Sequence, residues 1–157
     1  MSTVKERLKA LGLALPKAAA PVANYVPFVR SGNLVIISGQ ICLGPDGKIG
    51  DAHKGKLGGE VSEEAGIEAA RLCALNVLAQ LDAAVGDLDH GVERCLRLGG
   101  FINAVPSFAG LAPIMNGASD LMVEVLGERG RHARSTIGVA ELPLDAAVEV
   151  EAMFAVR

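Results

Sequence analysis

The sequence is poor in aromatic residues: it has no tryptophan, one tyrosine and four phenylalanines, so that aromatics make up 3% of 157 residues. Surfaces that bind single-stranded nucleic acid stack the bases on aromatic rings, and this composition argues against such a surface. The net charge of −3 and the pI of about 5.6 add no attraction for a polyanion. We therefore do not expect nucleic acid to be a partner.

Long hydrophobic runs are also missing. No apolar stretch approaches the roughly 18–20 residues that a membrane-spanning helix needs. The apolar stretch 10–15 is too short for the core of a signal peptide, and residues 1–7 carry both signs of charge. The three cysteines, Cys42, Cys73 and Cys95, are odd in number and form no Cys-x-x-Cys. We therefore expect no membrane association, and a cytoplasmic protein with buried free thiols.

The common motifs of cofactor and metal sites are absent from the sequence. The glycine-rich stretches lack the endings of a phosphate loop or a dinucleotide fingerprint, and there is no Gly-x-Ser-x-Gly elbow. His53, His90 and His132 are isolated in predicted loops or strand ends, without the spacing of a zinc site. We expect these histidines to be exposed, and the protein to use neither a metal nor a cofactor.

Small apolar residues, in contrast, are abundant. Half of the chain is hydrophobic, and 19 glycines come in addition. This excludes disorder, and it indicates one domain over residues 1–157 with a core of Ala, Val, Leu and Ile. The apolar surplus is most simply accommodated at an interface between subunits.

Hydrophobic periodicity and capping residues predict three helices. Thr3 and Glu6 form a capping box before a short helix over about 4–11. Ser62 begins the longest helix, which apolar residues three or four apart carry to residue 85, where Gly86 ends it. A further helix begins near Ala112 and ends at Gly127.

Alternating patterns predict five strands. They span residues 25–29, 34–39, 92–104, 135–141 and 146–156. The adjacent Gly99 and Gly100 suggest a bulge or a close backbone approach in the third strand. We expect the last two strands to form a hairpin. The order after the first helix is β-β-α-β-α-β-β, an α+β fold in which two helices cover one face of one sheet and leave the other face to a partner.

One pair of charged residues could perform chemistry. Arg134 lies at the start of a predicted strand and offers a planar fork for a carboxylate or phosphate. Glu149 lies in the next strand, where a carboxylate can hold or polarise a water molecule. The alternative interpretation is that Arg134 only pairs with Glu149 or Glu151 across the hairpin.

Four segments around these residues resemble a known family, the YjgF/Rid reactive-intermediate imine deaminases, many of which carry the older name endoribonuclease L-PSP. The resemblance covers about residues 15–157. The segments are Leu15–Ala19 followed by Asn24–Val26, Asn33–Ile41 with its Ser-Gly-Gln, Ala133–Pro143, and Val148–Ala152.

The resemblance implies a chorismate-mutase-like fold assembled as a homotrimer with a cleft between each pair of subunits. It implies hydrolysis of small 2-imino acids or enamines to 2-keto acids and ammonia, with Arg134 holding the substrate carboxylate and Glu149 positioning the attacking water. The remaining substrate-binding positions implied by it are Tyr25, Gly39, Asn116, Ser135 and Thr136.

The sequence departs from the family pattern in three places. The loop 50–59 is longer, the segment 110–113 contains an insertion and a proline, and the N-terminal helix is extra. These departures indicate a divergent subgroup. Two alternatives to the deaminase therefore stay open: a non-catalytic protein that binds small carboxylates in the same clefts, and the RNA-cleaving activity of the older family name.

Overall fold

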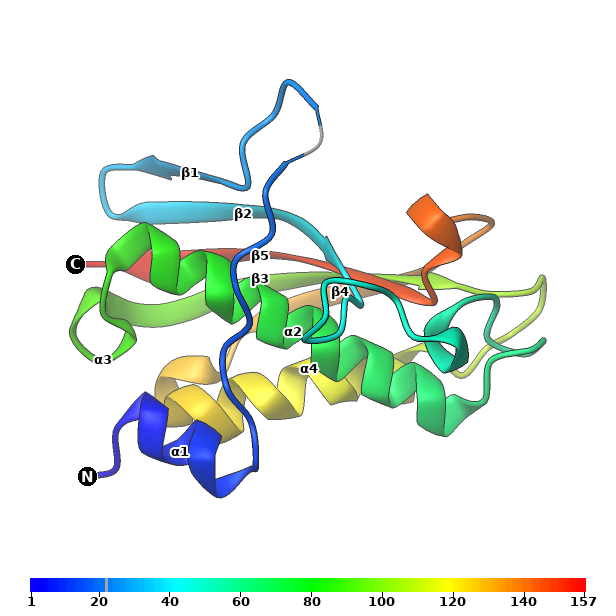
Figure 1. Ribbon diagram of the computed structural model, residues 1–157, viewed down its shortest axis with the longest axis horizontal. Helices are drawn as coiled ribbons and strands as arrows, with labels where there is room; N and C mark the ends of the chain where they lie inside the picture. The colour runs from blue at the N-terminus through cyan, green and yellow to red at the C-terminus, as the bar shows by residue number, and fades with distance from the viewer. Residues whose placement is uncertain (22) are drawn as a thin grey trace.

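The computed structural model describes residues 1–21 and 23–157 and shows one five-stranded sheet in the order β1-β2-β5-β3-β4 (Figure 1). The strands are β1 (Phe28–Ser31), β2 (Leu34–Ile41), β3 (Val92–Asn103), β4 (Ala133–Val139) and β5 (Val148–Val156). The α-helices are α1 (Val4–Ala10), α2 (Glu63–Val85), α3 (Leu88–Gly91) and α4 (Leu111–Leu126). Three short 3-10 helices are η1 (Asp51–His53), η2 (Gly127–Gly130) and η3 (Pro143–Asp145). The predicted α+β class is confirmed.

The predicted helix ends are confirmed in their chemistry. The side chains of Thr3 and Glu6 each accept a hydrogen bond from the other's backbone N–H, which closes the capping box of α1. The Ser62 hydroxyl accepts from the backbone N–H of Ala65 at the start of α2. Gly86 ends α2 with a φ of 77°, which is the left-handed conformation that glycine adopts at least cost.

The predicted C-terminal hairpin is wrong. β4 pairs with β3 in parallel, and β5 runs antiparallel between β2 and β3. The reason is the helix α4, which lies between β3 and β4 in the chain. A helical crossover returns the chain to the same end of the sheet, so the two strands that it joins run parallel. β3 therefore separates β4 from β5.

The two adjacent glycines of β3 serve close packing, not a bulge. The pairing with β4 and β5 is regular at Gly99 and Gly100. A Cβ atom on Gly100 would lie 2.5 Å from the sulfur of Met115 in α4, and one on Gly99 would lie 2.7 Å from the carboxylate of Glu151. The bulge of this sheet that matters for the site lies in β2, where one extra residue falls between Ile37 and Gln40 relative to β5.

The two faces of the sheet differ in cover. Helices α2 and α4 pack on one face, and α1 lies beside α4 (Figure 1). The core between them consists of aliphatic side chains, among them Val35, Leu78, Ile102, Leu121 and Val150. On the opposite face, which we call the open face, the apolar side chains Val29, Leu34, Ile36 and Ile137 are exposed.

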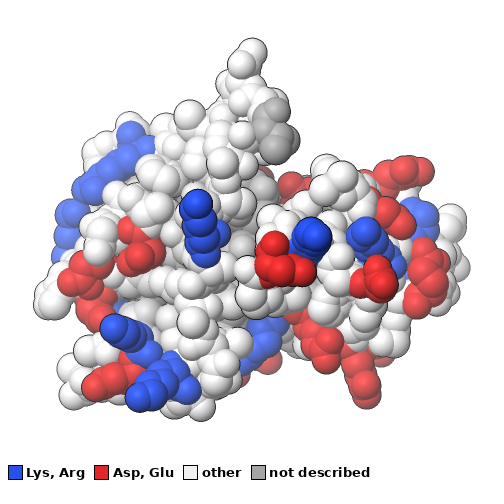
Figure 2. Space-filling model, in the orientation of Figure 1, with Lys and Arg blue, Asp and Glu red and all other residues white. Residues whose placement is uncertain are grey.

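The N-terminal helix α1 is held in place by the face that it turns to the rest of the molecule. Val4 and Leu8 are buried, and the Arg7 guanidinium donates to the carbonyl oxygen of Val125 at 3.4 Å. Charged side chains of both signs gather over the outer face of α1 (Figure 2), where Lys5 and Lys9 are exposed. In the described residues, no helix combines the length and the apolar character needed to cross a membrane.

Candidate functional site

A cleft of about 510 Å³ on the described surface is lined by three of the predicted site residues. They are Tyr25, Gly39 and Glu149. The remaining lining comes from β2, η3 and the loops around them and is mostly apolar: Ala19, Ala20, Pro21, Pro27, Gln40, Ile41, Leu43, Gly47, Pro143 and Leu144. Tyr25 is 51% exposed, so its ring is available to a ligand or to a second chain.

Gly39 makes room for the carboxylate of Glu149. The β2 bulge places Gly39 so close to Glu149 that a Cβ atom there would overlap the Glu149 carboxylate. Ser38 fixes the bulge by donating a 2.7 Å hydrogen bond to the Val26 carbonyl, and Gln40 donates to the Ser38 carbonyl at 3.0 Å. Because the central residue of the Ser-Gly-Gln segment has no side chain, the Glu149 carboxylate can occupy the space beside it.

The pKa of Glu149 is raised above the usual value of a glutamate. Burial is the main cause, and the negative charge of Glu151, two residues along the same strand, adds to it. A carboxylate that holds a proton more readily is suited to accept one from a bound water molecule.

Arg134 lies on the other side of the sheet. Its pairing position opposite Leu98 directs it to the helix-covered face, and its guanidinium meets α4. Nη1 donates to Asn116 Oδ1 at 2.8 Å and to Ser119 Oγ at 3.0 Å, and Nη2 donates to the Ala112 carbonyl at 3.2 Å. Within the described residues, the Nε–H and one N–H of Nη2 have no acceptor. Two N–H groups on one guanidinium can bind both oxygens of a carboxylate.

Asn116 and Thr136 lie on the same side of the sheet as Arg134, whereas Ser135 lies on the side of Glu149. Asn116 contacts the guanidinium directly. Ser135 is exposed on the open face, opposite Gly99. Thr136 points to the helix-covered face, and its hydroxyl oxygen is buried without a hydrogen-bond partner in the described structure. The predicted site therefore forms two groups in one chain: Tyr25, Gly39 and Glu149 in the cleft, and Arg134 and Asn116 at α4.

The alternative pairing of Arg134 with Glu149 or Glu151 is wrong. β3 separates the strands that carry them, and Arg134 points to the opposite face of the sheet from Glu149. Glu151 instead forms a 3.3 Å ion pair with Arg97 of β3. Arg134 makes its contacts with the oxygens of α4.

Sequence reasoning missed two residues next to Arg134. His132, which we expected to be exposed, is partly buried; its Nε2 lies 2.9 Å from Ser119 Oγ and its Nδ1 lies 2.6 Å from the Gly130 carbonyl. The period of two along an extended segment places residues 132 and 134 on one side, and the helical step of three places residues 116 and 119 on one side. Together, these two periodicities could have predicted that residues 116, 119, 132 and 134 lie close to one another.

The other two histidines differ in their exposure. His90 is exposed as expected, with 88% of its side chain accessible. His53 has only 15% accessible, and its Nε2 lies 3.3 Å from the Glu68 carboxylate, so the expectation of exposure is wrong for this residue. Among the described residues, no group of three or more His, Cys, Asp and Glu side chains could hold a metal ion.

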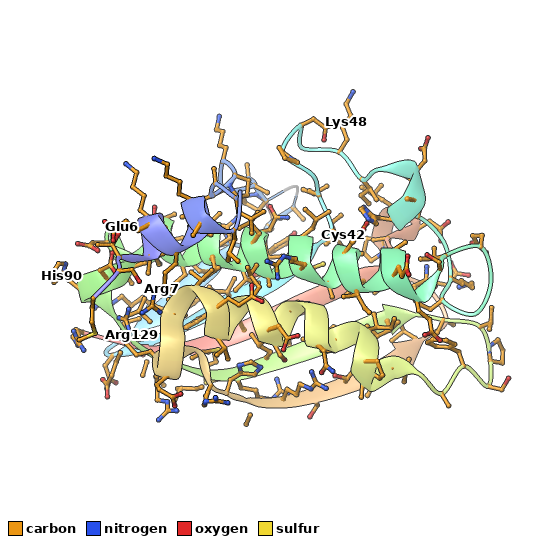
Figure 3. The ribbon with its side chains drawn as sticks, turned by 90° about the horizontal axis from the view of Figure 1, so that it is seen from below. Glu6, Arg7, Cys42, Lys48, His90 and Arg129 are labelled. Carbon is orange, nitrogen blue, oxygen red and sulfur yellow. The ribbon has the colours of Figure 1, made fainter. Side chains whose placement is uncertain are left out.

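The three cysteines are free and buried, as predicted. Two of them lie close together, with Cys42 beside α2 (Figure 3) and Cys73 within that helix. The neighbouring Cys73 thiol is the main cause that lowers the pKa of Cys42 to about 6, and the Cys73 thiol donates to the Val148 carbonyl at 3.3 Å. Burial raises the pKa of Cys73.

Comparison with known proteins places the fold and sequence in context. Residues 5–156 match the protein family described as "YjgF/chorismate mutase-like, putative endoribonuclease". The chain is 48% identical to protein TCP17 of Trypanosoma cruzi, over 96% of this chain and 92% of that one. The structure of Atu1372, a protein of unknown function from Agrobacterium tumefaciens, superposes with a TM-score of 0.90 at 46% identity, covering 98% of this chain and 92% of that one. Escherichia coli TdcF, solved with bound serine, superposes with a TM-score of 0.64 at 29% identity over 90% of this chain and 94% of that one.

Proposed function

The chain belongs to the YjgF/chorismate mutase-like family, and from this membership we propose that it is an enamine/imine deaminase that hydrolyses small 2-imino acids to 2-keto acids and ammonia. The observation that carries the proposal is the half-buried Glu149 in a cleft with Tyr25 and Gly39, its pKa raised by burial. Such a carboxylate can orient a water molecule and accept its proton.

We propose that the site is completed between subunits of a homotrimer. Two observations support this assembly. Arg134 and Glu149 point to opposite faces of one sheet, so a single chain does not combine the two groups. The exposed apolar side chains of the open face are suited to contact further copies of the chain. In the trimer, the Arg134 group of one chain would lie opposite the Glu149 group of the next.

In the proposed reaction, the free N–H groups of Arg134 hold the substrate carboxylate and fix the neighbouring imine carbon. Glu149 accepts a proton from water as the water oxygen bonds to that carbon, and the electron pair of the C=N bond moves to nitrogen, which takes up the proton from Glu149. In the resulting carbinolamine the hydroxyl gives its proton to Glu149 as the C=O bond forms and the C–N bond breaks; the nitrogen takes this proton and leaves as ammonia, and the 2-keto acid remains. Because an imine carbon is already electrophilic, orientation and proton transfer are sufficient for this reaction.

Ammonia release from imines generated by an amino-acid oxidase tests the proposal. We expect the protein to accelerate the release, and Arg134→Ala and Glu149→Gln to reduce it at least 100-fold. Glu93→Gln, at an exposed position of β3, is the control for the glutamate, and Arg131→Ala is the control for the arginine; both should keep activity within a few-fold. No acceleration by the original protein would exclude the deaminase, and equal rates for Arg134→Ala and the original protein would exclude Arg134 as the carboxylate clamp.

A second candidate is a non-catalytic protein that binds small carboxylates in the same cleft. The structure of TdcF with bound serine favours it, because serine carries a carboxylate and an amino group on one small molecule. Saturable binding of 2-ketobutyrate or serine that Arg134→Ala abolishes, with no turnover of any imine, would support this candidate over the deaminase.

Cleavage of RNA, the activity in the family description, has weaker support. The chain is acidic, and basic and acidic side chains are interspersed over the right-hand part of the face in Figure 2. Such a surface does not attract a polyanion strongly. Cleavage of a labelled RNA by nuclease-free protein, lost in Glu149→Gln, would favour this activity instead.

A further inference from the structure

The group of polar side chains between α4 and the start of β4 has a directed hydrogen-bond order. His132 Nδ1 lies 2.6 Å from the Gly130 carbonyl oxygen, which can only accept a hydrogen bond. Nδ1 therefore carries the proton in neutral His132, and Nε2 presents a lone pair. Ser119 Oγ lies 2.9 Å from that Nε2, so the serine hydroxyl donates to the histidine.

The direction of this bond determines what Ser119 offers to Arg134. With its hydrogen directed to His132, the hydroxyl oxygen turns its lone pairs outward. One of them accepts the 3.0 Å hydrogen bond from Arg134 Nη1, beside the 2.8 Å bond to Asn116 Oδ1. Both hydrogens of Nη1 are thereby used on the protein, and the two N–H groups without a partner in the described residues are on Nε and Nη2.

We propose that Ser119 and His132 are positioning residues for Arg134: His132 in its Nδ1–H form orients the Ser119 hydroxyl, which holds Nη1 and so presents the Nε and Nη2 side of the guanidinium to the substrate carboxylate. This role rests on the proposed function of Arg134 as the carboxylate clamp. Neither residue is placed in contact with substrate. Their effect is on binding of the carboxylate, not on the later proton transfers at Glu149.

The hydrogen-bond order of this group also depends on which ring nitrogens of His132 carry a proton. The charged groups around it are Arg134 across Ser119, and Arg131 and Arg94, which line the neighbouring surface hollow; the Arg94 guanidinium donates to the Arg131 carbonyl at 3.2 Å. Arg131 is itself paired with the Glu128 carboxylate, its Nε lying 3.0 Å from Glu128 Oε1. A proton on Nε2 would turn the Ser119 bond around, so the hydrogen-bond order described above requires an Nε2 without a proton.

Kinetics and direct binding together test the proposal. For Ser119→Ala we expect KM for the imino acid and Kd for 2-ketobutyrate to rise about ten-fold, the order expected for a lost hydrogen bond to a charged group, with kcat within about two-fold. Ser119→Thr keeps the hydroxyl and should restore both constants. Ser2→Ala, at an exposed serine ahead of α1 and away from the open face, is the control for the substitution itself.

Two substitutions of His132 distinguish the roles of its two ring nitrogens. His132→Gln places an amide oxygen near the position of Nε2 and should retain most of the affinity, whereas His132→Asn replaces only the Nδ1 donor and should behave like Ser119→Ala. In the original protein, ¹⁵N shifts should show Nδ1 protonated and Nε2 without a proton at neutral pH. An Nε2–H form would overturn the proposal even if the variants failed to fold.

The outcomes distinguish this proposal from the function on which it rests. If Arg134→Ala loses 2-ketobutyrate binding and Ser119→Ala does not, the positioning role is wrong and the clamp stands. If Arg134→Ala binds 2-ketobutyrate like the original protein, the clamp and the positioning role fail together. A fall in thermal stability of Ser119→Ala with unchanged KM and Kd would assign the group a purely structural role.

Discussion

At the scale of single residues, Glu149 is a carboxylate in surroundings that oppose its charge. Burial and the neighbouring Glu151 raise its pKa, and Gly39 holds the space that its carboxylate fills. Such a group costs folding free energy when it is ionised, because the folded state binds the proton more tightly than the unfolded state does. Residues kept against stability in this way are typical of functional sites.

The pKa shift of Glu149 makes a prediction about stability. Because its folded pKa is raised, its contribution is most favourable below the pKa of the unfolded chain and is lost as the pH rises through the folded pKa. Glu149→Gln should therefore have the higher melting temperature at pH 7, by up to a few degrees, and the difference should vanish near pH 4. Glu93→Gln, an exposed position, should show no such gain. Equal melting curves for Glu149→Gln and the original protein at pH 7 would contradict the assignment.

At the scale of the elements, α1, α2 and α4 were predictable from local chemistry, whereas the four-residue helix α3 and the strand order were not. Ser62 and Gly86 mark both ends of α2 because caps satisfy backbone groups that lie within one turn of them. The pairing of β4 with β3 depends on how α4 crosses the sheet, and no alternation within β4 records that choice. The hairpin expectation followed from chain proximity, and it misplaced Arg134 relative to Glu149.

The cap of α2 provides a test of this local reasoning. A Cβ atom at Gly86 would meet nothing within 4 Å, so substitution costs only the strain of a φ of 77°. Gly86→Ala should lower the free energy of unfolding by about 1 kcal/mol, and Gly86→Asn should cost less. Gly50→Ala is the control, because its φ of −64° suits any residue. Urea unfolding measures all three, and a Gly86→Ala as stable as Gly50→Ala would contradict the capping account.

The candidate site was predictable in its members and only partly in its arrangement. The motif segments identify Tyr25, Gly39 and Glu149, which the structure gathers in one cleft. They also contain Arg134, which contacts Asn116, a position outside these segments that the resemblance implied. That these groups lie apart in one chain follows from the sheet order, which no short motif encodes.

At the scale of the whole molecule, part of the chain's high apolar content lies exposed on the uncovered face of the sheet. Val29, Leu34, Ile36 and Ile137 are exposed there, whereas α2 and α4 cover the other face. Val29 and Ile36 are directly paired across β1 and β2, and an exposed apolar surface of this kind typically marks an interaction site. In the proposed trimer, further copies of the chain cover it, and the same contact completes the site.

Substitution on the open face should therefore change the molecular mass in solution. We expect about 49 kDa by light scattering, three times the 16.2 kDa of one chain. Ile36→Asp should shift the mass toward one chain, because a charge would be buried at the interface. Leu11→Asp introduces the same charge at a similarly exposed leucine beside α1 and should leave the mass unchanged. A monomeric original protein would contradict the trimer.

The central claim, that Arg134 of one chain and Glu149 of another form one site, is tested most directly by complementation. Arg134→Ala and Glu149→Gln chains are each expected to be inactive alone. When equal amounts are unfolded and refolded together, about a quarter of the clefts should combine an intact Arg134 with an intact Glu149 if chains assemble at random into a ring. The account predicts that ammonia release returns to about a quarter of the original rate. A mixture as inactive as either variant alone, at the same oligomeric mass, would contradict it.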